Sequence, residues 1–169
     1  MDDTTTGTGD APRPGTTDPQ RSRQRALKIL FQADLRGQDP RDALAAIMDD
    51  PRASEMLDDV DDDTRPAGEA AVDAYAVRLV EGVATHRPDL DRLIEKFARR
   101  WTVARMPVVD RNVLRLGAYE LLHEDLSPAV VIDQALELAK ALSTDNSARF
   151  VNGVLESVRR WRADTQKAG

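Results

Sequence analysis

The segment from Val108 to Leu122, VVDRNVLRLGAYELL, places apolar side chains on nearly every face of a helix. A helix with that composition is stable only when other elements cover it on several sides. The segment therefore predicts a central helix with further helices packed around it. No other stretch shows a convincing strand pattern, and no internal repeat is visible. The fold class that follows is all-α.

The other apolar residues recur with the helical period and predict the helices that surround this segment. The stripes comprise Leu27, Leu30, Phe31 and Leu35, a short piece from Asp42 to Met48, Val72 to Val83, Leu90 to Trp101, Ile132 to Leu142, and Phe150 to Val158. Pro88 is expected in the first turn of a separate helix. Ser127 and Pro128 suit an N-cap and a first helical position. We expect about seven helices in two packed helical bundles.

Two segments are too polar to belong to a packed core. Residues 1–19 contain hardly any apolar side chain, so we expect a disordered acidic tail. Residues 49–69, which include DDVDDD, are expected to form an acidic loop insert within a helical domain of residues 20–165. The DDVDDD run lacks the glycine and the glutamate of an EF-hand, which favours a solvated loop over a calcium site. Without these segments the net charge of −6 becomes positive.

Residues able to perform catalysis are scarce. The chain has no cysteine and only two histidines, His86 and His123, which we expect near helix ends as capping or surface residues. No P-loop, GxSxG or HExxH motif is present. We therefore expect no enzymatic activity, no cofactor and no metal site. The lack of a membrane-spanning run, a signal sequence or cysteine predicts a cytoplasmic protein that does not bind membranes.

The first expected helix begins with four basic residues. In RSRQRALKILFQADL, Arg21, Arg25 and Lys28 share one side and the leucines occupy the other, so the sequence predicts a basic stripe facing solvent. Positive charge at a helix N-terminus is disfavoured by the macrodipole. A phosphate-rich partner such as nucleic acid explains the placement. A face that only improves solubility is an equally good interpretation.

A second informative stretch is LSTDNSARFVNGVLESV. Residues 143–147 are all capping types and predict a tight turn between two helices. Gly153 then lies inside a helix, where it costs about 1 kcal/mol relative to alanine unless another backbone passes close by. Close helix packing at Gly153 and a buried, hydrogen-bonded amide at Asn152 are the favoured interpretation.

Taken together, four motifs resemble the NusB family of bacterial transcription antitermination factors. They are the R-x-R-x-x-A-L-x-x-L-F start, VDRNVLRLGAYELL, VVIDQALELAKALST and FVNGVL, in order over about residues 20 to 160. The resemblance implies an all-helical protein of two bundles without catalytic activity or cofactor. It also implies binding to single-stranded boxA RNA of ribosomal RNA operon transcripts. The implied partners are NusE, a small-subunit ribosomal protein, and the RNA polymerase antitermination complex.

The resemblance assigns functional roles to particular residues. The implied RNA-binding residues are Arg21, Arg23, Arg25, Lys28, Asn146, Arg149 and Phe150, and the implied NusE contacts are Phe31 and Asp110. A place in the core is an equal alternative for Phe150. Many family members carry tyrosine, glutamate and an acidic residue where this chain has Phe31, Asp110 and Asn146. These departures leave the contact geometry open.

Other functions compete with antitermination. A NusB-like domain also serves as the RNA-targeting part of an RNA methyltransferase family, but a chain ending at residue 169 leaves no room for the catalytic domain, so a free-standing factor is expected. A structural adaptor or a homodimer without RNA is the second alternative. The acidic tail and insert are expected to compete with RNA for the basic stripe.

Overall fold

The computed structural model describes residues 18–50, 52–53, 57 and 72–169. Its helices are α1 (Pro19–Leu35), α2 (Pro40–Asp49), α4 (Ala74–Ala98), the 3₁₀ helix η1 (Val103–Arg105), α5 (Val108–His123), α6 (Pro128–Leu142) and α7 (Asp145–Ala168). No strand occurs within these ranges. The predicted all-α class is confirmed, whereas the predictions for most of the acidic tail and insert fall outside the described residues.

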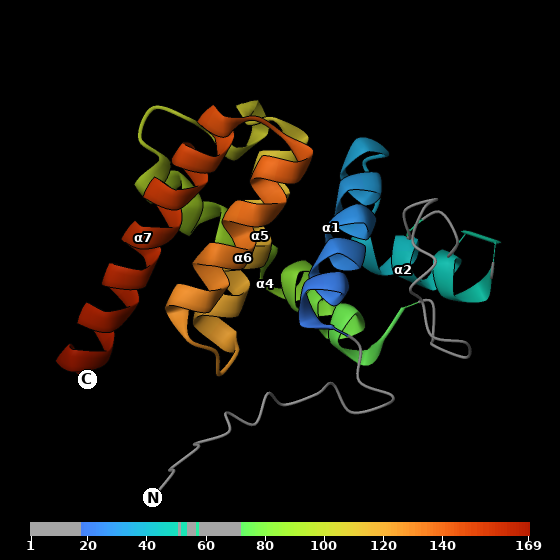
Figure 1. The fold of residues 1–169 in the computed structure, drawn as a ribbon, viewed down its shortest axis with the longest axis horizontal. Coiled ribbons are helices and arrows are strands. Elements are labelled where there is room, and N and C mark those ends of the chain that lie inside the picture. Colours follow the sequence, from blue (N-terminus) through green and yellow to red (C-terminus); the bar gives the residue numbers. More distant parts are fainter. Residues whose placement is uncertain (1–17, 51, 54–56, 58–71) are drawn as a thin grey trace, which may run out of the picture.

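The helices form two bundles that share α4 (Figure 1). One bundle contains α1, α2 and the beginning of α4, where Arg41 of α2 donates a hydrogen bond to Thr85 of α4. The other contains α5, α6, α7 and the end of α4, where Lys96 lies over the ring of Trp161 in α7. The predicted arrangement of two packed helical bundles is confirmed.

The central position of α5 is also confirmed. Every residue from Asn112 to Leu121 is buried, including the polar and charged ones. Helices α1, α4, α6 and α7 all pack against it. A helix surrounded in this way must satisfy its polar side chains inside the protein, because water cannot reach them. The partners of those side chains largely determine the candidate sites described below.

The prediction of a helix break at Pro88 was wrong. α4 runs without interruption from Ala74 to Ala98, with Pro88 inside it. Proline costs about 3 kcal/mol in a helix interior because it lacks an N–H and crowds the preceding turn. Here the proline ring is exposed, whereas Val83 and Leu90 on either side of it are buried in the core. Burial of the apolar side chains before and after Pro88 offsets the free-energy cost of a proline inside the helix.

Side-chain caps fix most helix starts. The carboxylates of Asp18, Asp39 and Asp73 and the hydroxyl of Thr144 accept backbone N–H groups at the starts of α1, α2, α4 and α7. These bonds satisfy donors that would otherwise have no partner in the helix. Ser127 occupies the N-cap position of α6 as predicted, although its side chain makes no capping bond.

The prediction for Gly153 and Asn152 was wrong. Both residues are exposed on α7, and a Cβ added at Gly153 would meet nothing within 4 Å. Close packing instead requires the glycine of α4, since a Cβ at Gly82 would lie 2.1 Å from the Tyr119 ring. The helical period alone does not show which side of α7 a neighbour covers.

Candidate nucleic-acid interface

Arg23 and Arg25 of α1 are buried, and the burial of Arg25 contradicts the solvent-facing stripe predicted for Arg21, Arg25 and Lys28. Arg23 is 3% exposed, and its Nε donates to both carboxylate oxygens of Glu120 in α5, at 2.8 and 3.1 Å. The hydroxyl of Tyr75 in α4 also donates to Glu120. Burial raises the pKa of Glu120, and the bonds from Tyr75 and Arg23 oppose that rise. Arg23 therefore joins α1 to the central helix.

Arg25 has a similar structural position. It is 1% exposed, and its Nη1 lies 3.4 Å from Oδ2 of Asp73, the N-cap residue of α4. The same aspartate accepts a hydrogen bond of 2.7 Å from the hydroxyl of Ser22. The helical wheel of α1 placed Arg25 on the outer face because a wheel does not include the neighbouring elements. The carboxylate of Asp73, at the N-cap of α4, covers Arg25 in the folded protein.

Arg21 and Lys28 are half-buried. The Nζ of Lys28 donates to the backbone carbonyl of Leu57 at 2.7 Å. The two residues are therefore the more accessible members of the predicted basic set. They still differ from the freely solvated stripe that the sequence suggested.

The start of α7 lines a small pocket that contains two of the predicted RNA-binding residues. Asn146 and Phe150 lie one turn apart, and Trp101 of the α4–α5 connection lies on the same pocket. Its volume is about 280 Å³, and Met106, Pro107, Asp110 and Ser147 complete the lining. Phe150 is partly buried and also packs against the hydrophobic core, as the alternative interpretation expected, while RNA binding by this residue stays a prediction. Trp101 was missed because it continues an apolar stripe, although it lies beyond the end of α4.

Arg149 lies on a different face of α7. It lines a hollow of about 350 Å³ with Asn152 and with Lys140 of α6. The structure thus brings Asn146 and Phe150 together but turns Arg149 toward the groove between α6 and α7. The exposed Asn152 of the FVNGVL motif belongs to this second face.

Asp110 does not offer a free charge to a partner. Its side chain is 4% exposed, and its two carboxylate oxygens accept hydrogen bonds of 2.9 Å from the hydroxyls of Ser143 and Ser147. These bonds hold the turn between α6 and α7 against the start of α5. The prediction of a direct, charged NusE contact at Asp110 conflicts with this burial. Its geometry supports a positioning role for the pocket that it lines.

Phe31 lines an apolar groove between α1, α5 and α6. The groove has a volume of about 340 Å³ and is formed by Leu27, Lys28, Phe31, Gln32, Val109 and Leu142. Leu142 is 46% exposed, and Leu35, one turn beyond Phe31, is 61% exposed. Leu35 therefore does not join the core as its apolar spacing predicted. Exposed apolar residues grouped in this way are typical of a protein-binding surface.

The predicted RNA-binding residues fall into two separate groups. Arg23 contacts Glu120 near the end of α5, whereas Asn146 and Phe150 lie beside Asp110 at its beginning. Ten helical residues span about 15 Å. The Arg23 contact and the pocket at the start of α7 are therefore separated by about 15 Å along α5.

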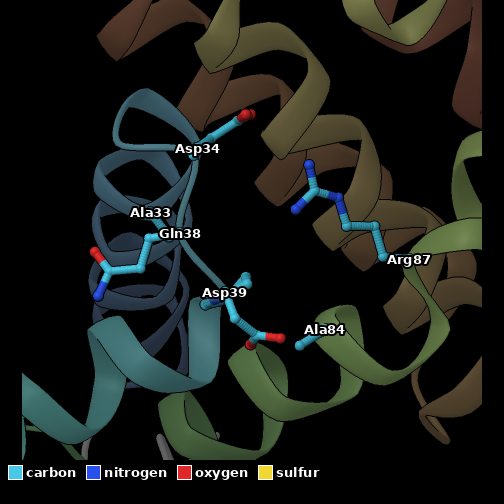
Figure 2. A pocket seen from close by; sticks show the side chains of 8 residues that line it. Ala33, Asp34, Gln38, Asp39, Ala84 and Arg87 are labelled. Atoms are coloured by element: carbon cyan, nitrogen blue, oxygen red, sulfur yellow. The ribbon is translucent and has the colours of Figure 1, made fainter.

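Another pocket, of about 330 Å³, lies between the α1–α2 turn and α4 (Figure 2). Asp34 and Asp39 reach it from one side and Arg87 from the other. Its carboxylates already have partners, because Asp34 binds Arg111 and Asp39 caps α2. This pocket is therefore a weaker candidate for a ligand site than the pocket at α7.

The two histidines form a stacked pair at the end of α5. His123 ends α5 as predicted, whereas His86 lies inside α4 because that helix continues through Pro88. Their ring centroids are 4.0 Å apart, and Tyr119 stacks on His123 at 5.2 Å. Burial and the neighbouring His86 lower the pKa of His123. Among the described residues, no group of three or more His, Cys, Asp or Glu side chains is placed to hold a metal ion.

The two bundles, the apolar groove and the adjacent aromatic pocket define an all-α binding module. No helix in the described part has the length and apolar character needed to cross a membrane.

The NusB family model matches residues 20–160. The transcription antitermination protein NusB of Acidothermus cellulolyticus is 49% identical over 140 residues, covering 82% of this chain and 85% of the relative. The transcription antitermination protein NusB of Saccharopolyspora erythraea is 49% identical over 137 residues, covering 80% of this chain and 82% of the relative.

Solved structures agree with this match. The structure of NusB from T. maritima has a TM-score of 0.68 and 35% identity, covering 86% of this chain and 92% of its own. A structure of antitermination factors NusB and NusE in complex with double-stranded RNA has a TM-score of 0.66 and 27% identity, covering 83% and 95%. The chain belongs to the NusB family. It is a transcription antitermination protein and not an enzyme.

Proposed function

We propose that the protein promotes antitermination by binding boxA RNA of ribosomal RNA operon transcripts together with NusE. The RNA occupies the pocket at the start of α7, where Asn146 and Phe150 contact an unstacked base. NusE occupies the apolar groove that contains Phe31. The complex acts on RNA polymerase in the cytoplasm. A solved structure of a similar chain contains NusE and double-stranded RNA, which supports the proposal.

The adjacency of these two surfaces carries the proposal. Val109 lines the groove and Asp110, the next residue of α5, lines the pocket. A protein in the groove and an RNA in the pocket would therefore lie beside each other. Such ligands can contact one another, which explains joint binding without any movement of the fold. Arg21, Lys28 and Arg149 are proposed to contact the RNA beyond the pocket, whereas Arg23 and Arg25 position α1.

The test is a fluorescence-anisotropy titration of labelled boxA RNA with and without NusE. Phe150→Ala is expected to weaken RNA binding in both conditions, because it removes the aromatic wall of the pocket. Phe31→Ala is expected to leave binding by the protein alone unchanged and to reduce only the tightening produced by NusE. Equal effects of the two substitutions under both conditions would contradict two separate surfaces.

Salt dependence provides an independent check. Binding through phosphates falls with salt at a log–log slope of about 0.7 per phosphate contacted on a single strand, whereas an apolar protein interface hardly responds. We expect a steep slope for RNA and a shallow one for NusE. A wild-type protein that ignores boxA RNA even with NusE present would refute the proposed function.

A further inference from the structure

The connection between α4 and α5 is an unusual element of this fold. Arg99 and Arg100 follow the end of α4 with φ values of 37° and 57°. Residues with a Cβ rarely adopt positive φ, because the side chain crowds the backbone. Backbone conformations of this kind persist only where the surrounding structure holds them, and they cluster at functional sites.

Buried anchors hold the connection in place. The backbone N–H of Val103 donates to Oε1 of Glu95 at 2.8 Å, and the side chains of Val103 and Met106 are buried. Between α4 and these anchors the chain turns outward, so Trp101 is 50% exposed. Tryptophan is enriched at interfaces, because its ring is apolar and its indole N–H can donate a hydrogen bond.

The connection is also strongly basic. Arg99, Arg100 and Arg105 are exposed, as is Lys96 in the last turn of α4, and the sequence has no acidic residue from Lys96 to Val109. None of these four forms an ion pair with a described residue. The arginines of α5 differ, since Arg111 and Arg115 both bind Asp34. The positive charge of the connection is thus available to an external anion.

The exposed tryptophan of the connection lines the pocket at the start of α7, and Arg100 precedes it directly in the sequence. Trp101 and Phe150 line it from two elements, and the exposed amide of Asn146 lies on its lining. Its volume of about 280 Å³ is at the lower end of ligand pockets. A site of that size accepts one flat ring rather than a folded ligand.

We propose that the α4–α5 connection is a second RNA-binding element, in which Trp101 and Phe150 hold one base while Arg99, Arg100 and Arg105 bind the neighbouring phosphates. Aromatic stacking with adjacent cations is the usual way in which proteins hold single-stranded nucleic acid. The element supplies the accessible positive charge that buried Arg23 and Arg25 do not. This inference rests on the proposed RNA-binding function and assigns its main phosphate contacts to a different part of the chain.

Trp101 offers a direct test, because the chain contains only two tryptophans. In a Trp161→Phe variant, boxA RNA is expected to quench the fluorescence of Trp101. In the reciprocal Trp101→Phe variant the remaining Trp161 should not be quenched. Both measurements use a folded protein with an intact core, since each substitution keeps an aromatic ring.

Affinity measurements complete the test. Trp101→Ala is expected to raise the Kd for boxA RNA about tenfold, whereas Trp101→Phe should retain most of the affinity because a ring still stacks. The double variant Arg99→Gln/Arg100→Gln should reduce the salt slope by about 1.4, corresponding to two phosphates. A matched control is Arg41→Gln/Arg52→Gln, which changes the same charge in the region of α2, across the molecule from α7 (Figure 1).

The outcomes separate this inference from the proposed function. If RNA binds the wild type but the Trp101 and arginine variants behave like the control, the inference is overturned and the proposed function stands. If the variants weaken NusE binding and leave RNA binding unchanged, the connection is a protein-binding surface and the inference is again overturned. If the wild type fails to bind RNA even with NusE, both are refuted.

Discussion

Arg111 of α5 holds Asp34 of α1 through two hydrogen bonds, of 2.6 Å from Nε and 2.7 Å from Nη2. Arg115, one turn further along α5, reaches the same carboxylate at 3.2 Å and binds Asp91 of α4 at 2.7 Å. Asp34 thus links the N-terminal bundle to the central helix. Burial raises the pKa of Asp34, but the bonds from Arg111 and Asn112 bring it below its usual value.

Asp34→Asn is expected to destabilise the fold by about 3 kcal/mol at pH 7, because two arginines lose their carboxylate. The lowered pKa of Asp34 means that its contribution is complete above about pH 4 and is lost as the pH falls through the folded value. Urea denaturation at pH 7 and near pH 3 measures both effects. The difference in free energy of unfolding between Asp34→Asn and the wild type should be smaller at the lower pH. Asp133 is exposed, so Asp133→Asn is the control. Its free energy of unfolding is expected to lie within about 0.5 kcal/mol of the wild-type value.

Arg23→Gln separates stability from RNA binding. Removing this arginine leaves Glu120 buried without its cation, which is expected to cost about 3 kcal/mol. At a temperature where the variant remains folded, its affinity for boxA RNA should change less than that of Phe150→Ala. The pair Arg23→Met/Glu120→Gln should recover part of the stability, because no buried charge remains. A large loss of RNA affinity in a fully folded Arg23→Gln protein would show that Arg23 contacts RNA.

Asn146→Asp is expected to weaken boxA binding about fivefold, since a carboxylate beside a phosphate adds roughly 1 kcal/mol of repulsion in water. Asn146 is exposed in the first turn of α7, where a negative charge favours the helix, so loss of folding would not explain the result. Gln166→Glu introduces the same charge at an exposed position near the other end of α7 and is the control. Equal or tighter binding by Asn146→Asp in a filter-binding titration would contradict the prediction.

The histidine pair predicts a pH-dependent stability. The pKa of His123 is lowered by burial and by His86, so the unfolded chain takes up a proton at His123 before the folded protein does. Stability should therefore be complete above about pH 6.5 and should fall as the pH drops through the folded pKa. Melting temperatures between about pH 5 and pH 8 test this. His123→Phe keeps the ring stack, but its melting temperature should depend less on pH than that of the wild type. An equal fall in the melting temperature of both proteins would argue against His123 as the titrating group.

The sequence predicted the helical class and the central helix because apolar periodicity records which side of a helix is buried. It placed Arg25 on a solvent-facing side and did not foresee the burial of Arg23, since their carboxylate partners lie outside α1 and no single-helix pattern contains them. Pro88 illustrates a different limit, because core burial on both sides outweighs a local preference. Trp101 was assigned to a stripe although its backbone has already left the helix. Local patterns thus identify the elements, while the pairing of charges between elements depends on the fold.

The continuity of α4 through Pro88 makes the protein one cooperative folding unit despite its two bundles. The helix contributes buried side chains to both, with Leu79 in one and Ile94 in the other. Unfolding either end of α4 would expose the core on that side and withdraw support from the rest of the helix. The apolar groove and the aromatic pocket therefore depend on one continuous core, so loss of either bundle would disturb both surfaces.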